Sequence, residues 1–86
     1  MKIRYEFIKR EIVGEFFLIP VGEAAKKYSG MFALNEIGAF IWDILPTAET
    51  EEDIVKKITE EYEVSEETAA ADTAEFLGKL KDMGIL

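Results

Sequence analysis

The clearest hydrophobic pattern of the chain lies in residues 31–45, which read MFALNEIGAFIWDIL. The first four of these residues favour a short strand. Asn35 follows them as an N-cap, because its side-chain oxygen can accept a hydrogen bond from an early helical N–H. The pattern therefore predicts a strand that leads directly into an amphipathic helix, so that a sheet and a helical layer meet at Asn35. The apolar face of this helix has the i, i+3, i+4, i+7 spacing and comprises Ile37, Phe40, Ile41, Ile44 and Leu45.

Two further strands are predicted before this unit. Residues 3–12 mix aromatic and β-branched side chains with charges, which favours a partly exposed strand. A hairpin turn is expected at residues 13–15, where Gly14 can adopt a positive φ. The apolar run 16–21 favours a covered strand that ends near Pro20, since proline cannot donate to a strand ladder. Between this strand and the next we expect a loop with a helical turn at residues 23–27.

A second long helix is predicted after Pro46 has ended the first. Thr50 and Asp53 have the spacing of a capping box, and the helix is expected to reach Tyr62. Its outer face should carry two ion pairs at i, i+4 spacing, Glu52 with Lys56 and Asp53 with Lys57. Its inner face should bury Ile54, Val55, Ile58 and Tyr62.

A third long helix is predicted from Ser65, its N-cap, to Met83. Gly84 can take the left-handed conformation that ends a helix, which would let Ile85 fold back onto Leu80 in a Schellman motif. One stripe of this helix is expected to comprise Ala69, Thr73, Phe76, Leu80 and Met83. The wheel does not decide which flank faces the third strand, the one with Leu77 and Ala70 or the one with Asp72 and Lys79.

Strands that precede helices in this way indicate an α+β fold. The expected order is βββααα, a three-stranded antiparallel sheet followed by three helices, similar to a small winged helix-turn-helix with its strands placed first. The 86 residues are enough for one modest core, so we expect a single domain over residues 1–86. Trp42 is expected to pack in the core or at its rim.

Composition excludes several kinds of chemistry. The chain has no cysteine and no histidine, which removes thiolate chemistry, the commonest general base and the commonest metal ligand. It also lacks a glycine-rich phosphate loop and a G-x-S-x-G elbow. We therefore expect no catalytic residues, no metal site, no cofactor and no enzymatic activity of its own.

Charge narrows the range of partners. The net charge is −8, and residues 49–86 carry all of the excess acid, which forms a solvated face rather than a cation site. Nucleic-acid binding needs clustered Lys and Arg and is not expected. The first residues lack the apolar region of a signal peptide, and no run is long enough to span a membrane. We expect a cytoplasmic protein that contacts no membrane.

Four stretches carry a combination of motifs that is specific when taken together. They are REIVGEFFLIPVGE at 10–23, GMFALNEIGAFIWDIL at 30–45, TEEDIVKKITEEYEVSEE at 50–67 and ADTAEFLGKLKDMGIL at 71–86. With these stretches the chain resembles the PqqD-like family, the peptide-recognition domains of ribosomal-peptide modification pathways. Two positions of the last helix depart from the family pattern: Thr73 replaces an aliphatic residue, and Gly78 lies inside the helix, which costs about 1 kcal/mol relative to alanine.

The resemblance implies a binding site and two partners. The leader segment of a precursor peptide would add as a strand beside the third strand, in a groove roofed by the last helix. The modifying enzyme would be a radical S-adenosylmethionine (SAM) enzyme, expected on a separate chain because 86 residues leave no room for it. The implied peptide-binding residues are Gly30, Met31, Phe32, Ala33 and Leu34 on the strand, and Ala69, Thr73, Phe76, Leu77 and Leu80 on the helix.

The residues themselves give independent support for this site and leave two alternatives open. A short strand at a sheet edge offers unpaired N–H and C=O groups, which is the basis of strand addition. The small side chains of residues 68–74 would leave room for a peptide backbone, although alanine is also simply the best helix former. The alternatives are a DNA-binding winged helix, and a structural or regulatory module that forms a homodimer through its exposed edge.

Overall fold

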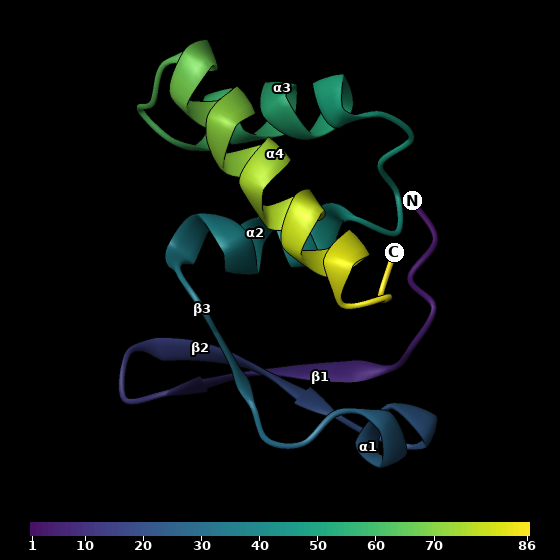
Figure 1. Ribbon diagram of the computed structural model, residues 1–86. Helices are drawn as coiled ribbons and strands as arrows, with labels where there is room; N and C mark the ends of the chain where they lie inside the picture. Colours follow the sequence, from purple (N-terminus) through teal and green to yellow (C-terminus); the bar gives the residue numbers. More distant parts are fainter.

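A three-stranded antiparallel sheet forms one layer of the protein, and helices form the other. The computed structural model describes residues 1–86. The sheet has the order β1-β2-β3, so β2 is central and β3 lies at an edge. Figure 1 shows that α2, α3 and α4 all lie on one side of this sheet. The strands are β1 (Phe7–Ile12), β2 (Glu15–Pro20) and β3 (Phe32–Leu34), and the helices are α1 (Glu23–Lys27), α2 (Glu36–Ile44), α3 (Glu51–Glu61) and α4 (Glu66–Asp82).

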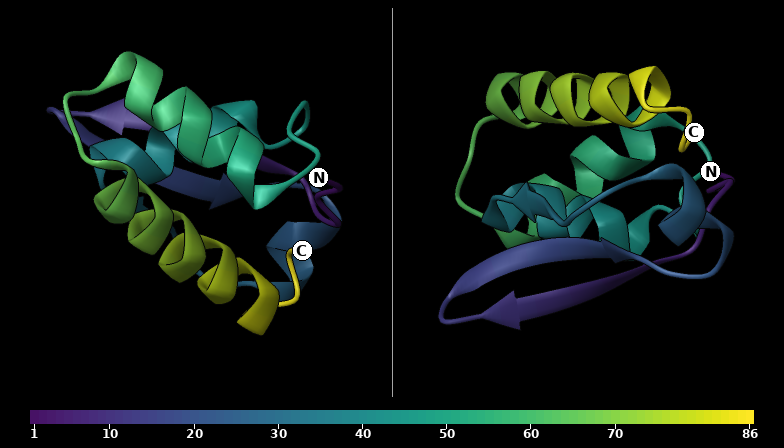
Figure 2. Two further views of the ribbon diagram at one scale, coloured as in Figure 1. Left: turned by 90° about the horizontal axis from the view of Figure 1, so that it is seen from above. Right: turned by 60° about the horizontal axis from the view of Figure 1, so that its bottom comes forward.

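The predicted α+β class and its order of strands and helices are confirmed. The expected helical turn between the second and third strands is the short helix α1. Figure 2 shows α3 and α4 side by side, with α2 between them and the sheet. None of these helices combines the length and the apolar character that crossing a membrane requires.

In the hairpin that joins β1 to β2, Gly14 is not the only residue with a positive φ. Val13 and Gly14 both have positive φ, 50° and 79°, as a two-residue turn between twisted strands requires. The predicted first strand began four residues too early, at residue 3. Part of the segment before Phe7 is held elsewhere, because the N–H of Arg4 donates to the carbonyl oxygen of Ile85 at 2.8 Å. This bond ties the two ends of the chain together.

The inner face of the sheet is set by Leu18, which is 1% exposed. Its partners in the neighbouring strands are Lys9 and Phe32, so these side chains share its face. Trp42 of α2 packs edge-on against Phe7 with ring centres 5.8 Å apart, as expected for a core residue. The remaining core comes from the helices and the C-terminus, with Ile41, Leu45, Ile54, Ile58, Leu77 and Ile85 among its most buried members.

Local capping begins and ends the helices where the sequence predicts it. The side chain of Asn35 accepts a hydrogen bond from the N–H of Gly38 at 2.7 Å. Thr50 and Asp53 form the capping box of α3. At the end of α4 the N–H of Ile85 donates to Leu80 O at 2.8 Å and that of Gly84 to Lys81 O at 3.0 Å, which together make a Schellman motif.

The two ion pairs predicted on α3 are wrong. The ion pairs of the structure are Lys9–Asp43, Lys26–Glu23 and Lys79–Glu75. The carboxylate of Asp53 instead accepts the backbone N–H groups of Glu49 and Thr50, both at 3.1 Å. These hydrogen bonds hold the pKa of Asp53 below its ordinary value. Capping satisfies backbone donors that have no other partner, whereas an exposed ion pair stabilises a helix only slightly.

Candidate functional site

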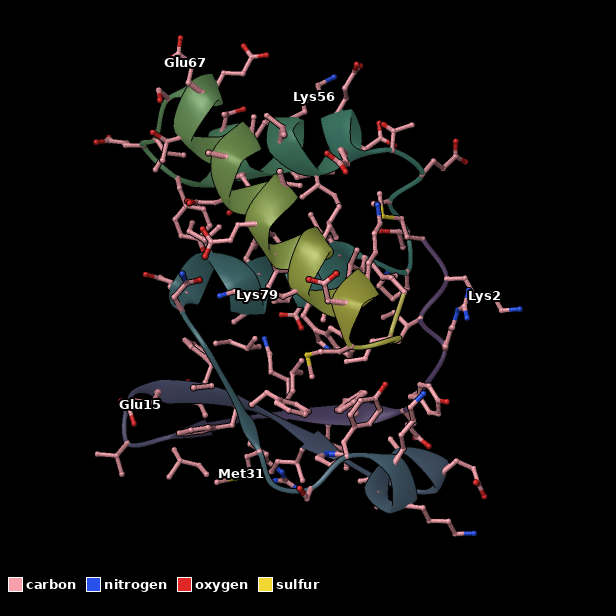
Figure 3. All side chains as sticks on the ribbon, in the orientation of Figure 1. Lys2, Glu15, Met31, Lys56, Glu67 and Lys79 are labelled. Carbon is pink, nitrogen blue, oxygen red and sulfur yellow. The ribbon has the colours of Figure 1, made fainter.

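A groove lined mostly by apolar side chains lies between β3 and α4. Its volume is about 410 Å³, and ten of its fifteen lining residues are hydrophobic. In Figure 3, Met31 marks the strand side of the groove and Lys79 the helix side. Volumes of this size are typical of ligand sites. The apolar lining comes mainly from Leu18, Phe32, Leu34 and Ile37 on the sheet and α2, and from Phe76, Leu80 and Met83 on α4 and its end.

The strand that borders the groove has an unpaired edge. β3 is hydrogen-bonded only to β2, and along an edge strand the backbone groups alternate between the partner strand and the open side. Ala33, whose side chain is exposed, nevertheless lines the groove. The free edge of β3 and the apolar groove therefore lie next to each other.

The opposite wall of the groove is one face of α4. Asp72, Glu75, Phe76 and Lys79 line it at the three- and four-residue spacing of neighbours on a helix surface. The carboxylate of Glu75 and the ammonium of Lys79 form an ion pair at 3.3 Å. The wall thus combines the apolar ring of Phe76 with a charged rim, which consists of Asp72, Glu75 and Lys79.

A close approach of α2 to α4 shapes one end of the groove. A Cβ atom at Gly38 would lie 3.5 Å from the ring of Phe76 and 3.1 Å from Oδ1 of Asn35. Any larger side chain at position 38 would therefore displace either the helix cap or the ring. The absence of a side chain at Gly38 thus permits the close approach of α2 to α4.

Six of the ten predicted peptide-binding residues line this groove. They are Met31, Phe32, Ala33, Leu34, Phe76 and Leu80. Gly30 does not line it but precedes the strand with a φ of 80°, where it turns the chain into β3. Four of the five predicted strand residues thus lie at the groove, and their contact with a peptide stays a prediction.

The structure corrects the placement of the other three residues. Ala69 and Thr73 are 0% exposed and Leu77 is 1% exposed, and none of the three lines the groove. Ala69 and Leu77 belong to the same hydrophobic core as α3. The hydroxyl of Thr73 donates to Ala69 O at 2.7 Å, which satisfies a polar group that would otherwise be costly to bury on that side.

Sequence reasoning missed the charged part of the wall. Asp72 and Lys79 occupy one of the two flanks left undecided, and it is this flank that faces β3. Asp72 lies four positions before Phe76 and Lys79 three positions after it, so all three share one side of the helix. This spacing was the signal that could have placed them at the groove. Phe76 and Leu77 are adjacent, large and apolar, so the hydrophobic pattern alone did not decide which side of the helix faces β3.

A second hollow lies near the chain ends, and its polar lining suits a ligand less well than the groove does. It is lined by Arg4, Tyr5, Glu6, Glu23, Lys27 and Gly84. The hydroxyl of Tyr5, 3.2 Å from the ammonium of Lys27, raises the pKa of that lysine. Two acids and two bases line this hollow, which leaves neither an apolar floor nor a single sign of charge for a ligand. No three acidic side chains of the structure come together in a way that could hold a metal ion.

The fold and the groove define a small winged-helix-like protein with an open sheet edge beside an apolar cleft. The family model for coenzyme PQQ synthesis protein D (PqqD) matches residues 17–86. The chain therefore belongs to the PqqD family, which confirms the resemblance found in the sequence.

One solved structure extends this comparison. TbiB1 in complex with the TbiA(beta) leader peptide is similar to this chain with a TM-score of 0.71 and 29% sequence identity. The match covers 100% of this chain and 94% of that one. No curated protein sequence matches the chain.

Proposed function

We propose that this protein binds the leader segment of a ribosomally synthesised precursor peptide as an added strand beside β3. It then presents the peptide to a modifying enzyme on a separate chain and does not catalyse the modification itself. The observation that carries this proposal is the free edge of β3 next to an apolar groove of about 410 Å³.

The two halves of the site suit two parts of an extended peptide. Backbone groups on the free edge of β3 can bind any strand, and pockets for alternate side chains select among sequences. Successive side chains on one face of a strand are about 6.8 Å apart. Phe32 and Leu34 from the sheet and Phe76 from α4 provide apolar surface for them.

The comparisons support this use of the groove. TbiB1, which has a similar fold and 29% sequence identity to this chain, is bound to a leader peptide. This chain belongs to the PqqD family. A DNA-binding function is disfavoured, because the groove wall carries Asp72 and Glu75 but only one lysine and the net charge is −8. Phosphate contacts require the opposite charge.

Catalysis is assigned to the partner for chemical reasons. The chain has neither histidine nor cysteine, so its candidate groups for proton transfer are carboxylates, amines and hydroxyl groups. A radical SAM enzyme, which brings its own iron–sulfur cluster, is the partner that the family resemblance implies. The binding protein would then raise the local concentration of the precursor at that enzyme.

Amide shift mapping tests the location of the peptide. The probe is the synthetic leader segment of the short precursor encoded nearest to the gene for this chain, titrated into labelled protein. We expect shifts in residues 31–34 and along the groove side of α4. Shifts confined to α3, or none at saturating peptide together with binding of duplex DNA, would overturn the proposal.

A backbone N-methyl scan of the same leader tests strand addition. Methylation removes a donor N–H, and in a strand only every second residue directs its N–H to the neighbouring strand. We expect the dissociation constant to rise at alternate positions, by about fivefold for a hydrogen bond with a net value of about 1 kcal/mol. A helical or irregular peptide would show no period of two.

A further inference from the structure

Three charged side chains line the groove, and only one of them lacks a counter-ion. Glu75 and Lys79 neutralise each other at 3.3 Å. Asp72 belongs to none of the three ion pairs of the structure. It is half-buried and lines the groove, so the groove wall carries one uncompensated negative charge.

The position of this carboxylate along the groove follows from the packing. Asp72 lies one helical turn before Phe76, whose ring meets Gly38 at the beginning of α2. β3 and α4 run in opposite directions in Figure 1 and in the right-hand view of Figure 2. Asp72 is therefore at the Asn35 end of the groove. Lys79 is about 10 Å further along α4, which corresponds to about three residues of an extended peptide.

A peptide strand that fills the groove removes water from this carboxylate. Loss of hydration around a charge is costly unless an opposite charge or hydrogen-bond donors replace the water. Lys79 cannot compensate Asp72 without leaving Glu75. The ligand must therefore supply the cation, or keep that end of the groove wet.

We infer that the groove selects leader segments in which a lysine or arginine accompanies the alternating apolar residues, at the position that faces Asp72. This inference rests on the proposed function and adds the class of peptide that the site accepts. An acidic residue at the same position places two carboxylates together in a partly dry groove, so it is rejected. Asp72 is thus a specificity-determining residue, whereas Phe76 supplies affinity for apolar side chains of any leader.

A peptide selection tests this inference with random sequences in place of the natural precursor. A displayed library of random twelve-residue peptides is panned against the full chain and against Asp72→Lys. The matched control is Asp82→Lys, which makes the same change in net charge on the same helix but does not line the groove. We expect wild type and the control to enrich alternating apolar residues with Lys or Arg at one fixed position, and Asp72→Lys to enrich Asp or Glu at that position.

A charge-swap cycle then measures the coupling. The probe is a synthetic peptide with the selected consensus, made with Lys or with Glu at the fixed position. We expect the Glu peptide to bind wild type roughly three- to tenfold more weakly than the Lys peptide, and Asp72→Lys to reverse this order. Asp82→Lys should keep the order of wild type, which separates a local contact from the overall charge.

Two outcomes would overturn the inference in different ways. Enrichment of alternating apolar peptides without any fixed cation would refute the role of Asp72 and leave leader binding intact. Failure to enrich extended peptides at all would refute the proposed function together with this inference.

Discussion

The two flanks of α4 belong to the same helix but have opposite surroundings, a closed core and an open groove. On one flank Ala69, Thr73 and Leu77 are almost completely buried. On the other flank Asp72 and Lys79 line an open groove. The first flank is closed by the core that it shares with α3, whereas the second faces a sheet that stops at β3.

This difference shows where the groove comes from. α4 has 17 residues and is about 25 Å long, while β3 has only three residues and no strand beyond it. In the proposed mode of binding, the leader peptide adds as a fourth strand beside β3 and covers apolar residues of α4 that remain half-exposed, such as Phe76. The groove exists because the sheet ends at β3 while the longer α4 extends past it. The charged side chains at the rim of the groove keep its apolar floor compatible with water.

The largest effect is expected on the closed flank. Leu77→Ala removes a side chain that is 1% exposed and should lower the free energy of unfolding by about 2–5 kcal/mol. Urea unfolding measures this loss. Glu75→Ala, on the open flank, should change it by less than about 0.5 kcal/mol. Equal losses for both variants would mean that the two flanks are not different.

A smaller effect, but on binding, is expected one residue earlier. Phe76→Ala removes a ring from the groove wall and should weaken leader binding about tenfold, or ~1.4 kcal/mol, as for other central aromatic contacts. Titration calorimetry gives the dissociation constant. Leu77→Ala is the control, because its folded fraction should bind with unchanged affinity. A Phe76→Ala variant with full affinity would show that peptides bind elsewhere.

The sequence predicts the fold well because the signals for its elements are local. Asn35, Thr50 and Ser65 cap three helices as expected, and Gly84 ends the last one. Each of these residues acts within a few positions of itself. The order of strands and helices then follows from the hydrophobic pattern.

The flank of α4 that faces the sheet could not be predicted in the same way. Phe76 and Leu77 are adjacent, both large and both apolar, and about 100° apart on the helix. Which of them enters the core depends on where α3 packs, which is a long-range contact. Thr73 was misplaced for a related reason: the family resemblance put it on the groove wall, but the carbonyl oxygen of Ala69 accepts its hydrogen bond in the core.

The smallest effect is expected on the outer side of α4, where Gly78→Ala should stabilise the protein. A Cβ atom at Gly78 would meet nothing within 4 Å, and glycine inside a helix is less favourable than alanine by about 0.5–1 kcal/mol. For a domain of this size, 1 kcal/mol corresponds to a rise in Tm of roughly 4–8 °C. Gly84→Ala should act in the opposite direction, because Gly84 has a φ of 80° that a side chain rarely tolerates. Gly78 does not line the groove, so leader affinity should stay unchanged in Gly78→Ala. A stabilised variant that binds leader more weakly would place the peptide beyond the groove, on the side of α4 that carries Gly78.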